Sequence, residues 1–140
     1  MRHTIIIAEA GVNHNGNMDI AKRLIDAAAD AGVDYVKFQT FKTENLVSFN
    51  APTAEYQKAA TQETSQYAML KRLELNEQQH IELIEYCNKK GVKFLSTAFD
   101  MDSIDLLESL NLDLWKIPSG EITNYPYLAR IAATGKPIIM

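Results

Sequence analysis

The sequence lacks the features that mark several specialised classes of protein. Cys87 is its one cysteine, so an intrachain disulfide is impossible, and we expect it to be a small buried hydrophobic residue. No apolar run is long enough for a signal-peptide core or a membrane span, and the net charge of −4 argues against a nucleic-acid partner. The three histidines have no metal-ligand spacing. We therefore expect a cytoplasmic protein with neither nucleic-acid nor membrane partners.

Apolar runs alternate with amphipathic stretches along the chain. The runs predict strands at residues 4–8, 35–40, 92–96, 112–117 and 136–140. The stretches between them predict helices that begin after the expected N-caps Asn17, Asn76, Asp100 or Asp102, and Asn124. This alternation predicts an α/β fold with a parallel sheet and right-handed crossovers.

Two folds are built in this way, the open doubly wound sheet and the (β/α)₈ TIM barrel. A complete barrel takes about 250 residues, so the 140 residues of this chain correspond to roughly half of one. The chain ends in an apolar run, whereas a self-contained doubly wound fold normally adds a closing helix after its fifth strand. We therefore expect residues 1–140 to form the N-terminal half of a parallel TIM barrel, containing its first five strands.

Residues 41–75 interrupt the alternation. This stretch is polar, with Pro52 early and a short helical pattern at Tyr67, Leu70 and Leu73. It predicts a long loop with a small helix. A functional role is favoured because the loop leaves the carboxyl end of a strand.

Polar side chains stand where each of the first four expected strands ends. They are Glu9 after the first, Lys37 and Gln39 in the second, Ser96 and Thr97 in the third, and Lys116, Ser119, Gly120 and Glu121 around the fourth. The carboxyl ends of parallel strands meet at one rim, which holds the active site in TIM-barrel enzymes. The pattern therefore predicts a single site at that rim.

The chemistry of these side chains is that of an anion site. Lys37 and Lys116 would bring two ammonium groups to one mouth, and Ser119 would add a hydroxyl near a helix start. Such donors suit a phosphate or carboxylate dianion. Glu9 and Glu121 would neutralise the lysines, hold a sugar hydroxyl or move a proton.

Each of these residues also has a purely structural interpretation. The lysines and glutamates would form salt bridges that stabilise the rim, and Gln39, Ser96 and Thr97 would satisfy backbone groups at strand ends. His14 is expected to hold the turn at residues 13–16, and His3 and His80 are expected at the surface. The acidic residues Asp100, Asp102 and Asp105 are expected to cap and coat a helix.

The chain resembles bacterial sialic acid synthases, and the resemblance rests on six motifs in order. They are Ile7-Ala8-Glu9-Ala10-Gly11-Val12-Asn13-His14-Asn15-Gly16, Val36-Lys37-Phe38-Gln39-Thr40, Leu95-Ser96-Thr97-Ala98-Phe99, Lys116-Ile117-Pro118-Ser119-Gly120-Glu121, Asn124-Tyr125-Pro126 and Gly135-Lys136-Pro137-Ile138. Residues 41–47 look closest to the N-acetylneuraminate and N,N'-diacetyllegionaminate branch of this family.

The resemblance implies a larger protein than this chain. The family has a TIM barrel followed by a small antifreeze-like (SAF) domain, and it usually forms a domain-swapped homodimer. The C-terminal half of the barrel and the SAF domain are absent here, so we expect this fragment alone to be inactive. The implied activity joins phosphoenolpyruvate to N-acetylmannosamine, or to a related 2,4-diacetamido hexose, giving a nonulosonic acid and phosphate for lipopolysaccharide or capsule biosynthesis.

The resemblance also implies roles for individual residues. Lys37, Lys116 and Ser119 would bind phosphoenolpyruvate, Thr97 would lie beside it, Gln39 would face the sugar, and Glu9 and Glu121 would be the catalytic carboxylates. A divalent metal, Mn²⁺ or Mg²⁺, would be held by ligands beyond residue 140, with none in this chain. Two other functions remain open: a Schiff-base aldolase that uses Lys37 or Lys116, and a non-catalytic anion-binding half-barrel.

Overall fold

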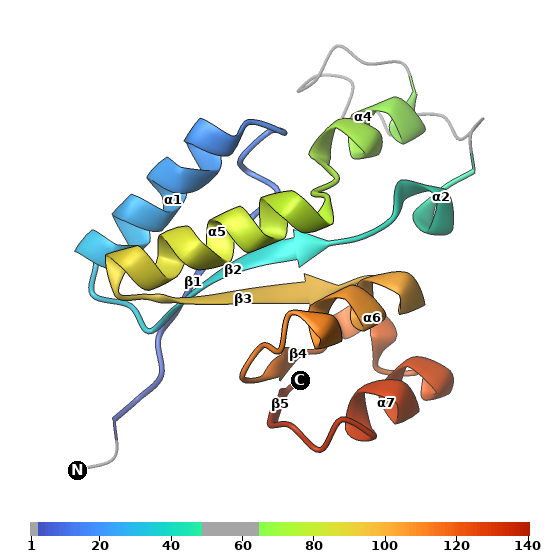
Figure 1. Ribbon diagram of the computed structural model, residues 1–140. Helices are drawn as coiled ribbons and strands as arrows, with labels where there is room; N and C mark the ends of the chain where they lie inside the picture. Colours follow the sequence, from blue (N-terminus) through green and yellow to red (C-terminus); the bar gives the residue numbers. More distant parts are fainter. Residues whose placement is uncertain (1–2, 49–64) are drawn as a thin grey trace.

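The structure is a computed structural model that describes residues 3–48 and 65–140 (Figure 1). The elements are β1 (Ile7–Gly11), α1 (Met18–Asp30), β2 (Tyr35–Thr40), α2 (Thr43–Leu46), α4 (Gln66–Leu73), α5 (Glu77–Lys90), β3 (Lys93–Ala98), α6 (Met101–Ser109), β4 (Trp115–Lys116), the 3-10 helix η1 (Ser119–Glu121), α7 (Tyr125–Ala132) and β5 (Ile138–Ile139). Among these, no helix has the length and apolar character needed to cross a membrane.

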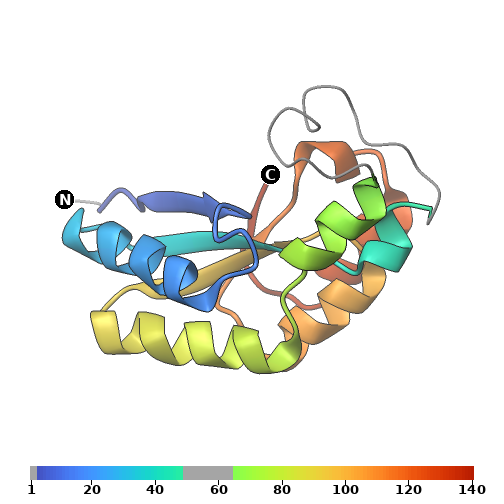
Figure 2. The same cartoon turned by 90° about the horizontal axis from the view of Figure 1, so that it is seen from above.

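All of the strand pairs in the described chain are parallel. Strands β1, β2 and β3 form one sheet in that order, and β4 pairs with β5. Strand β4 also packs against β3, so the two sheets are adjacent. Helices α1 and α5 lie side by side on one face of the three-stranded sheet (Figure 2). The predicted parallel α/β arrangement is therefore confirmed.

Strand alternation divides the side chains of the sheet between two faces. Val36, Phe38 and Phe94 point toward α1 and α5 and belong to the main hydrophobic core. Tyr35 and Leu95 point the other way and pack with a smaller apolar layer, to which Leu114, Ile7 and Ile139 also belong. Side chains on this second face nearer the carboxyl ends of the strands form the site described below.

The helix boundaries follow the capping residues that the sequence predicts. Asn17 accepts hydrogen bonds from the backbone of the first turn of α1, and Asn76 forms a reciprocal capping box with Gln79 before α5. Asp100, rather than Asp102, caps α6. Gly91 ends α5 in the left-handed conformation, with φ +76°.

Several strand predictions need correction. Strand β2 has the predicted bounds, but β1 begins later than expected, and Ile5 and Ile6 before it are 54% and 51% exposed. Strands β4 and β5 contain two residues each and are shorter than predicted. Apolar runs alone do not show where strand pairing starts, because β-branched residues favour an extended chain in or out of a sheet.

The interrupted region contains two helices in its described part. The predicted small helix is present as α4, whereas the short helix α2 was not predicted. Pro52 lies outside the described residues. Cys87 is fully buried as predicted, and burial raises its pKa to about 12, so the thiol stays protonated.

His80 is buried, which contradicts its predicted surface position. Its Nδ1 lies 2.8 Å from the carbonyl oxygen of Asn76, so this nitrogen carries the proton and donates. The hydroxyl of Thr40 therefore donates to Nε2 at 2.8 Å, and the hydroxyl of Ser96 donates to that of Thr40 at 2.6 Å. The ring is thus fixed between α5 and the sheet by partners at both nitrogens.

His14 is also fully buried. Its Nδ1 accepts the backbone N–H of Gly16 at 3.1 Å, which confirms the prediction that this histidine holds its turn. Burial is the main cause that lowers the pKa of His14, and the nearby His80 adds to it. Burial likewise lowers the pKa of His80, more than the Asn76 carbonyl raises it.

Acidification is expected to destabilise the fold through these two histidines. Below the ordinary pKa of 6.5, the unfolded chain binds protons that the folded chain does not, so the free energy of unfolding falls with pH. The loss is at most about 1.4 kcal/mol per pH unit for each ring. Urea unfolding at about pH 7.5 and about pH 5.5 measures it.

His80→Gln should reduce this pH dependence. The matched control is His3→Gln, because the side chain of His3 is 72% exposed and lies outside the core. The explanation is wrong if His80→Gln leaves the stability difference between the two pH values unchanged.

Candidate functional site

A cavity of about 350 Å³ opens at the carboxyl ends of the first four strands. We call it the anion pocket. Its lining consists of Glu9, Gly11, Val12, Asn13, Lys37, Gln39, Thr97, Phe99, Lys116 and Pro118. Five of the seven site residues predicted from the sequence therefore meet in one place, and they come from four different strands or strand ends.

Strand register explains why these side chains meet. Glu9 pairs with Lys37 across β1 and β2, and Gln39 pairs with Thr97 across β2 and β3. In-register neighbours of parallel strands point to the same face, and residues two apart along a strand do so as well. The four side chains therefore share the face that carries the apolar layer, above its residues Tyr35 and Leu95.

Gly11 allows the backbone of β1 to lie close to the side chains of Glu9 and Gln39 in the anion pocket. The register shifts between Glu9 and Gly11, and Gly11 has a φ of +54°. A Cβ there would lie 3.2 Å from Oε1 of Glu9 and 3.6 Å from Nε2 of Gln39. The glycine thus provides both the left-handed backbone and the space for a carboxylate and an amide beside it.

The two lysines and one glutamate give the anion pocket an excess of positive charge. Lys37 is largely buried, with 13% of its side chain exposed, and its ammonium forms an ion pair with Glu9, which is 54% exposed. The ammonium of Lys116 donates to the carbonyl oxygen of Ile117. The predicted salt bridge at the rim is present for Lys37 and Glu9, whereas Lys116 has no carboxylate partner among the described residues.

Thr97 carries a polar atom that the described chain leaves unsatisfied. Its side chain lines the anion pocket, the residue is 2% exposed, and Oγ1 has no hydrogen-bond partner within residues 3–48 and 65–140. A buried hydroxyl without a partner costs about 1–3 kcal/mol. This hydroxyl therefore does not satisfy strand-end backbone, the structural role considered for it.

Ser119 and Glu121 lie outside the anion pocket. Ser119 is exposed in η1, and Glu121 accepts a hydrogen bond from Nδ2 of Asn124 at 2.6 Å. Glu121 lines a neighbouring cavity of about 530 Å³, which shares Phe99 with the anion pocket. The chain leaves β4 after Lys116, so strand alternation no longer directs the residues beyond Pro118.

Sequence reasoning missed the residues of the connecting loops. Val12, Asn13, Phe99 and Pro118 line the anion pocket but follow the strands rather than end them. Asn13 belongs to the turn that His14 holds, so its position depends on that turn. A glycine at the end of a strand, as at Gly11, is the one local signal for a close approach here.

No metal centre is complete within the described residues. Across 3–48 and 65–140, no three His, Cys, Asp or Glu side chains gather closely enough to hold a metal ion. Glu9 is the one carboxylate of the anion pocket, and it is already paired with Lys37. The side chains present here do not by themselves form a metal site.

The fold and this pocket define a parallel α/β protein with a cavity of net positive charge at the carboxyl ends of its strands. The model of the NeuB family matches residues 24–140, and the chain belongs to that family. The whole opening motif, residues 7–16, lies before the matched range.

The similar proteins are longer than this chain. It is 53% identical to the N,N'-diacetyllegionaminic acid synthase of Campylobacter jejuni over 100% of its own length and 42% of that protein. It is 36% identical to the human N-acetylneuraminate-9-phosphate synthase over 96% of its length and 38% of that protein. The chain therefore spans about two fifths of the curated relatives it matches.

A solved structure supports the same relationship. The N-acetylneuraminic acid synthetase of Leptospira borgpetersenii, crystallised with citrate, superimposes with a TM-score of 0.80 at 31% identity. The superposition covers 98% of this chain and 44% of that protein. The parallel strands described here therefore correspond to one part of a larger structure.

Replacement of Gly11 tests whether the anion pocket needs a residue without a side chain beside Glu9. Gly11→Ala should lose about 1 kcal/mol of stability because of its positive φ, and its Cβ should also displace the Glu9 carboxylate. The matched control is Gly91→Ala, which has a φ of +76° but nothing within 4 Å of the new Cβ.

We expect similar losses of stability in urea for the two variants, with severalfold weaker phosphoenolpyruvate binding in calorimetry for Gly11→Ala alone. Equal binding by Gly11→Ala and Gly91→Ala would show that the space beside Glu9 is unimportant.

Proposed function

We propose that this chain forms the N-terminal half of the (β/α)₈ barrel of an N-acylneuraminate synthase-type transferase. The complete enzyme would condense phosphoenolpyruvate with N-acetylmannosamine or a related 2,4-diacetamido hexose, giving a nonulosonic acid and phosphate. The names of the relatives support this reaction class, since they are synthases of legionaminic and neuraminic acids.

One observation carries the proposal: Lys37, Lys116 and Thr97 line one cavity at the strand ends, and the Thr97 hydroxyl has no hydrogen-bond partner among the described residues. Phosphoenolpyruvate has a phosphate and a carboxylate, and two ammonium groups with a hydroxyl donor match that pair of anions. The acidic composition of the chain makes a local positive excess notable, because the sequence as a whole has a net charge of −4.

In the proposed reaction, the methylene carbon of phosphoenolpyruvate bonds to the aldehyde carbon of the open-chain sugar. Water then adds to the neighbouring carbon, the one that carries the phosphate ester. The bond between this carbon and the bridging ester oxygen breaks, so that inorganic phosphate leaves. Lys37 and Lys116 would hold the substrate and stabilise the negative charge that moves onto the departing phosphate. Thr97 would donate to the enolpyruvate.

The positions of the two glutamates suggest different roles. Glu9 lies in the anion pocket and is half exposed, so it would orient the attacking water and accept its proton. Glu121 lies in the adjacent cavity and, with Ser119, would join the site only at its edge. Gln39 would face the sugar from beside Glu9.

The rest of the enzyme belongs to the proposal as well. We propose that the remaining barrel strands and an antifreeze-like domain lie outside residues 1–140, and that the complete protein is a cytoplasmic homodimer. A divalent metal, Mn²⁺ or Mg²⁺, would take its ligands from that remaining part. When bound, it would supply Lewis-acid chemistry, and no role of the residues above depends on it.

The test is phosphate release from phosphoenolpyruvate by the polypeptide that the gene encodes. N-acetylmannosamine and a 2,4-diacetamido hexose would be supplied in parallel, with and without added Mn²⁺. Amino-sugar-dependent phosphate release and a nine-carbon acid product are expected. Calorimetric binding of phosphoenolpyruvate without turnover of any amino sugar would instead indicate the non-catalytic anion-binding alternative.

Replacement of either lysine should remove most of the activity. Lys37→Met and Lys116→Met are each expected to lower kcat/KM for phosphoenolpyruvate by about a hundredfold, because the transferred phosphate loses a charge-stabilising contact. Lys22→Met is the matched control, since Lys22 lies on α1 and pairs with Glu82 outside the anion pocket. Steady-state kinetics with circular dichroism as a folding check would measure the effect.

Borohydride trapping separates the synthase from the Schiff-base aldolase. Borohydride treatment with substrate should leave both lysines unmodified in a synthase. A covalent adduct on Lys37 or Lys116 would overturn the proposed mechanism. The ion pair of Lys37 with Glu9 favours the anion-binding role over that of a free amine nucleophile.

A further inference from the structure

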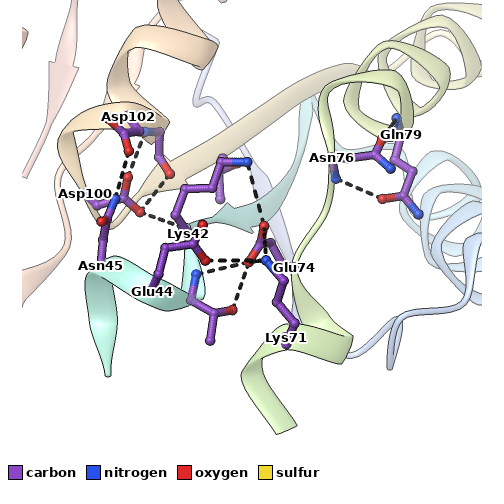
Figure 3. A network of polar contacts seen from close by, with 12 residues as sticks. Lys42, Glu44, Asn45, Lys71, Glu74, Asn76, Gln79, Asp100 and Asp102 are labelled. Atoms are coloured by element: carbon purple, nitrogen blue, oxygen red, sulfur yellow. Dashed lines mark hydrogen bonds and ion pairs between the residues drawn. The ribbon is translucent and has the colours of Figure 1, made fainter. Parts of the chain in front are cut away.

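Glu74 is a largely buried carboxylate that the proposed mechanism does not use. It follows α4 directly, and 10% of its side chain is exposed. Its Oε2 accepts the backbone N–H of Thr43 at 3.0 Å, the Thr43 hydroxyl at 2.9 Å and the ammonium of Lys71 at 3.0 Å (Figure 3). Burial alone would raise the pKa of Glu74, but these donors together hold it below its usual value.

These bonds fix the connection that leaves β2. Thr43 is fully buried and begins α2, so Glu74 satisfies two donors that have no access to water. On the other side of this connection, the N–H of Lys42 donates to Asp100 at 2.7 Å, and Asn45 donates to Asp102 at 3.0 Å (Figure 3). The connection is therefore held between the end of α4 and the start of α6.

Helix α4 also contacts the connections that leave β1 and β3. Its residues Met69 and Leu73 form a hydrophobic cluster with Phe41, and Val12 and Phe99 pack against this cluster. Val12 follows β1, Phe99 follows β3, and both line the anion pocket.

The turn after β1 touches α4 even more closely. A Cβ at Gly16 would lie 2.3 Å from the backbone oxygen of Arg72. This approach leaves no room for a side chain between the turn and the helix, so a shift of α4 would move the turn with it.

We propose that Glu74 is a positioning residue for the anion pocket. By joining α4 to the connection after β2, it holds three strand-end connections as one unit and keeps Val12 and Phe99 in place as pocket walls. Glu74 itself touches no substrate. This inference rests on the proposed function for its kinetic consequence, but not for the structural coupling that it describes.

The experiment compares Glu74→Ala and Glu74→Gln with Glu44→Gln in the polypeptide that the gene encodes. Glu44 is the matched control, because it contacts Lys71 at 3.4 Å in the same network but makes no bond to Thr43. Glutamine at position 74 keeps an oxygen that accepts from Thr43, so this variant should restore much of what alanine removes.

We expect Glu74→Ala to raise KM for phosphoenolpyruvate about tenfold with a smaller change in kcat, because the pocket walls shift by a fraction of an ångström or more. A merely structural role would reduce the folded fraction and so lower kcat without changing KM. Amide hydrogen exchange at residues 11–17, on the far side of α4, should also become faster in Glu74→Ala and stay unchanged in Glu44→Gln.

The two proposals fail in distinguishable ways. An active wild-type protein, with unchanged KM and unchanged exchange at residues 11–17 in Glu74→Ala, would overturn the positioning role and leave the synthase assignment intact. A wild-type protein that consumes no phosphoenolpyruvate would overturn the synthase, and the exchange result would then decide the coupling alone. Should Glu74→Ala fail to fold, Thr43→Val removes one of the two donors to Glu74 and provides the same comparison.

Discussion

The parallel register of β1, β2 and β3 is the constraint on which the site depends. Glu9 stands opposite Lys37, and Gln39 stands opposite Thr97, so one pattern of backbone hydrogen bonds creates both pairs. A slip of β2 by one residue would turn Lys37 toward α1 and α5 and bring Phe38, now fully buried, to the pocket face. The cost of burying an ammonium in an apolar core excludes that register, so the core and the site are fixed together.

Two apolar layers enforce this register from opposite faces of the sheet. Phe38 and Phe94 stack on the helix side, with ring centroids 5.4 Å apart. On the other side, Leu95 packs with Tyr35 and Leu114 below the polar side chains. The polar groups of the pocket therefore stand on an apolar floor, which keeps their ammonium and carboxylate groups at the strand ends and limits the directions in which they can move.

The sequence pattern was informative where local rules decide the structure. The polar residues in the second apolar run predicted that Lys37 and Gln39 lie at the carboxyl-end rim, and the Asn76 cap depends on residues three positions apart. It failed where partners are distant in sequence. His80 is buried because its ring bonds to Thr40, forty residues earlier, and Glu121 leaves the predicted site because the chain turns away after β4. Neither the burial of a histidine nor the path of a loop is encoded in short-range spacing.

Ser96 and Thr97 show how the fold separates structural from functional polarity. They are adjacent on β3, chemically alike and almost fully buried, yet they point to opposite faces of the sheet. The hydroxyl of Ser96 is bonded to Thr40 and through it to His80, on the helix side of the sheet. Thr97 lines the anion pocket on the other face, and its hydroxyl has no partner among the described residues. The two adjacent hydroxyls therefore differ in environment: the helix side gives Ser96 a hydrogen-bond chain that reaches α5, and the face without such a chain is the one on which we propose that the substrate binds.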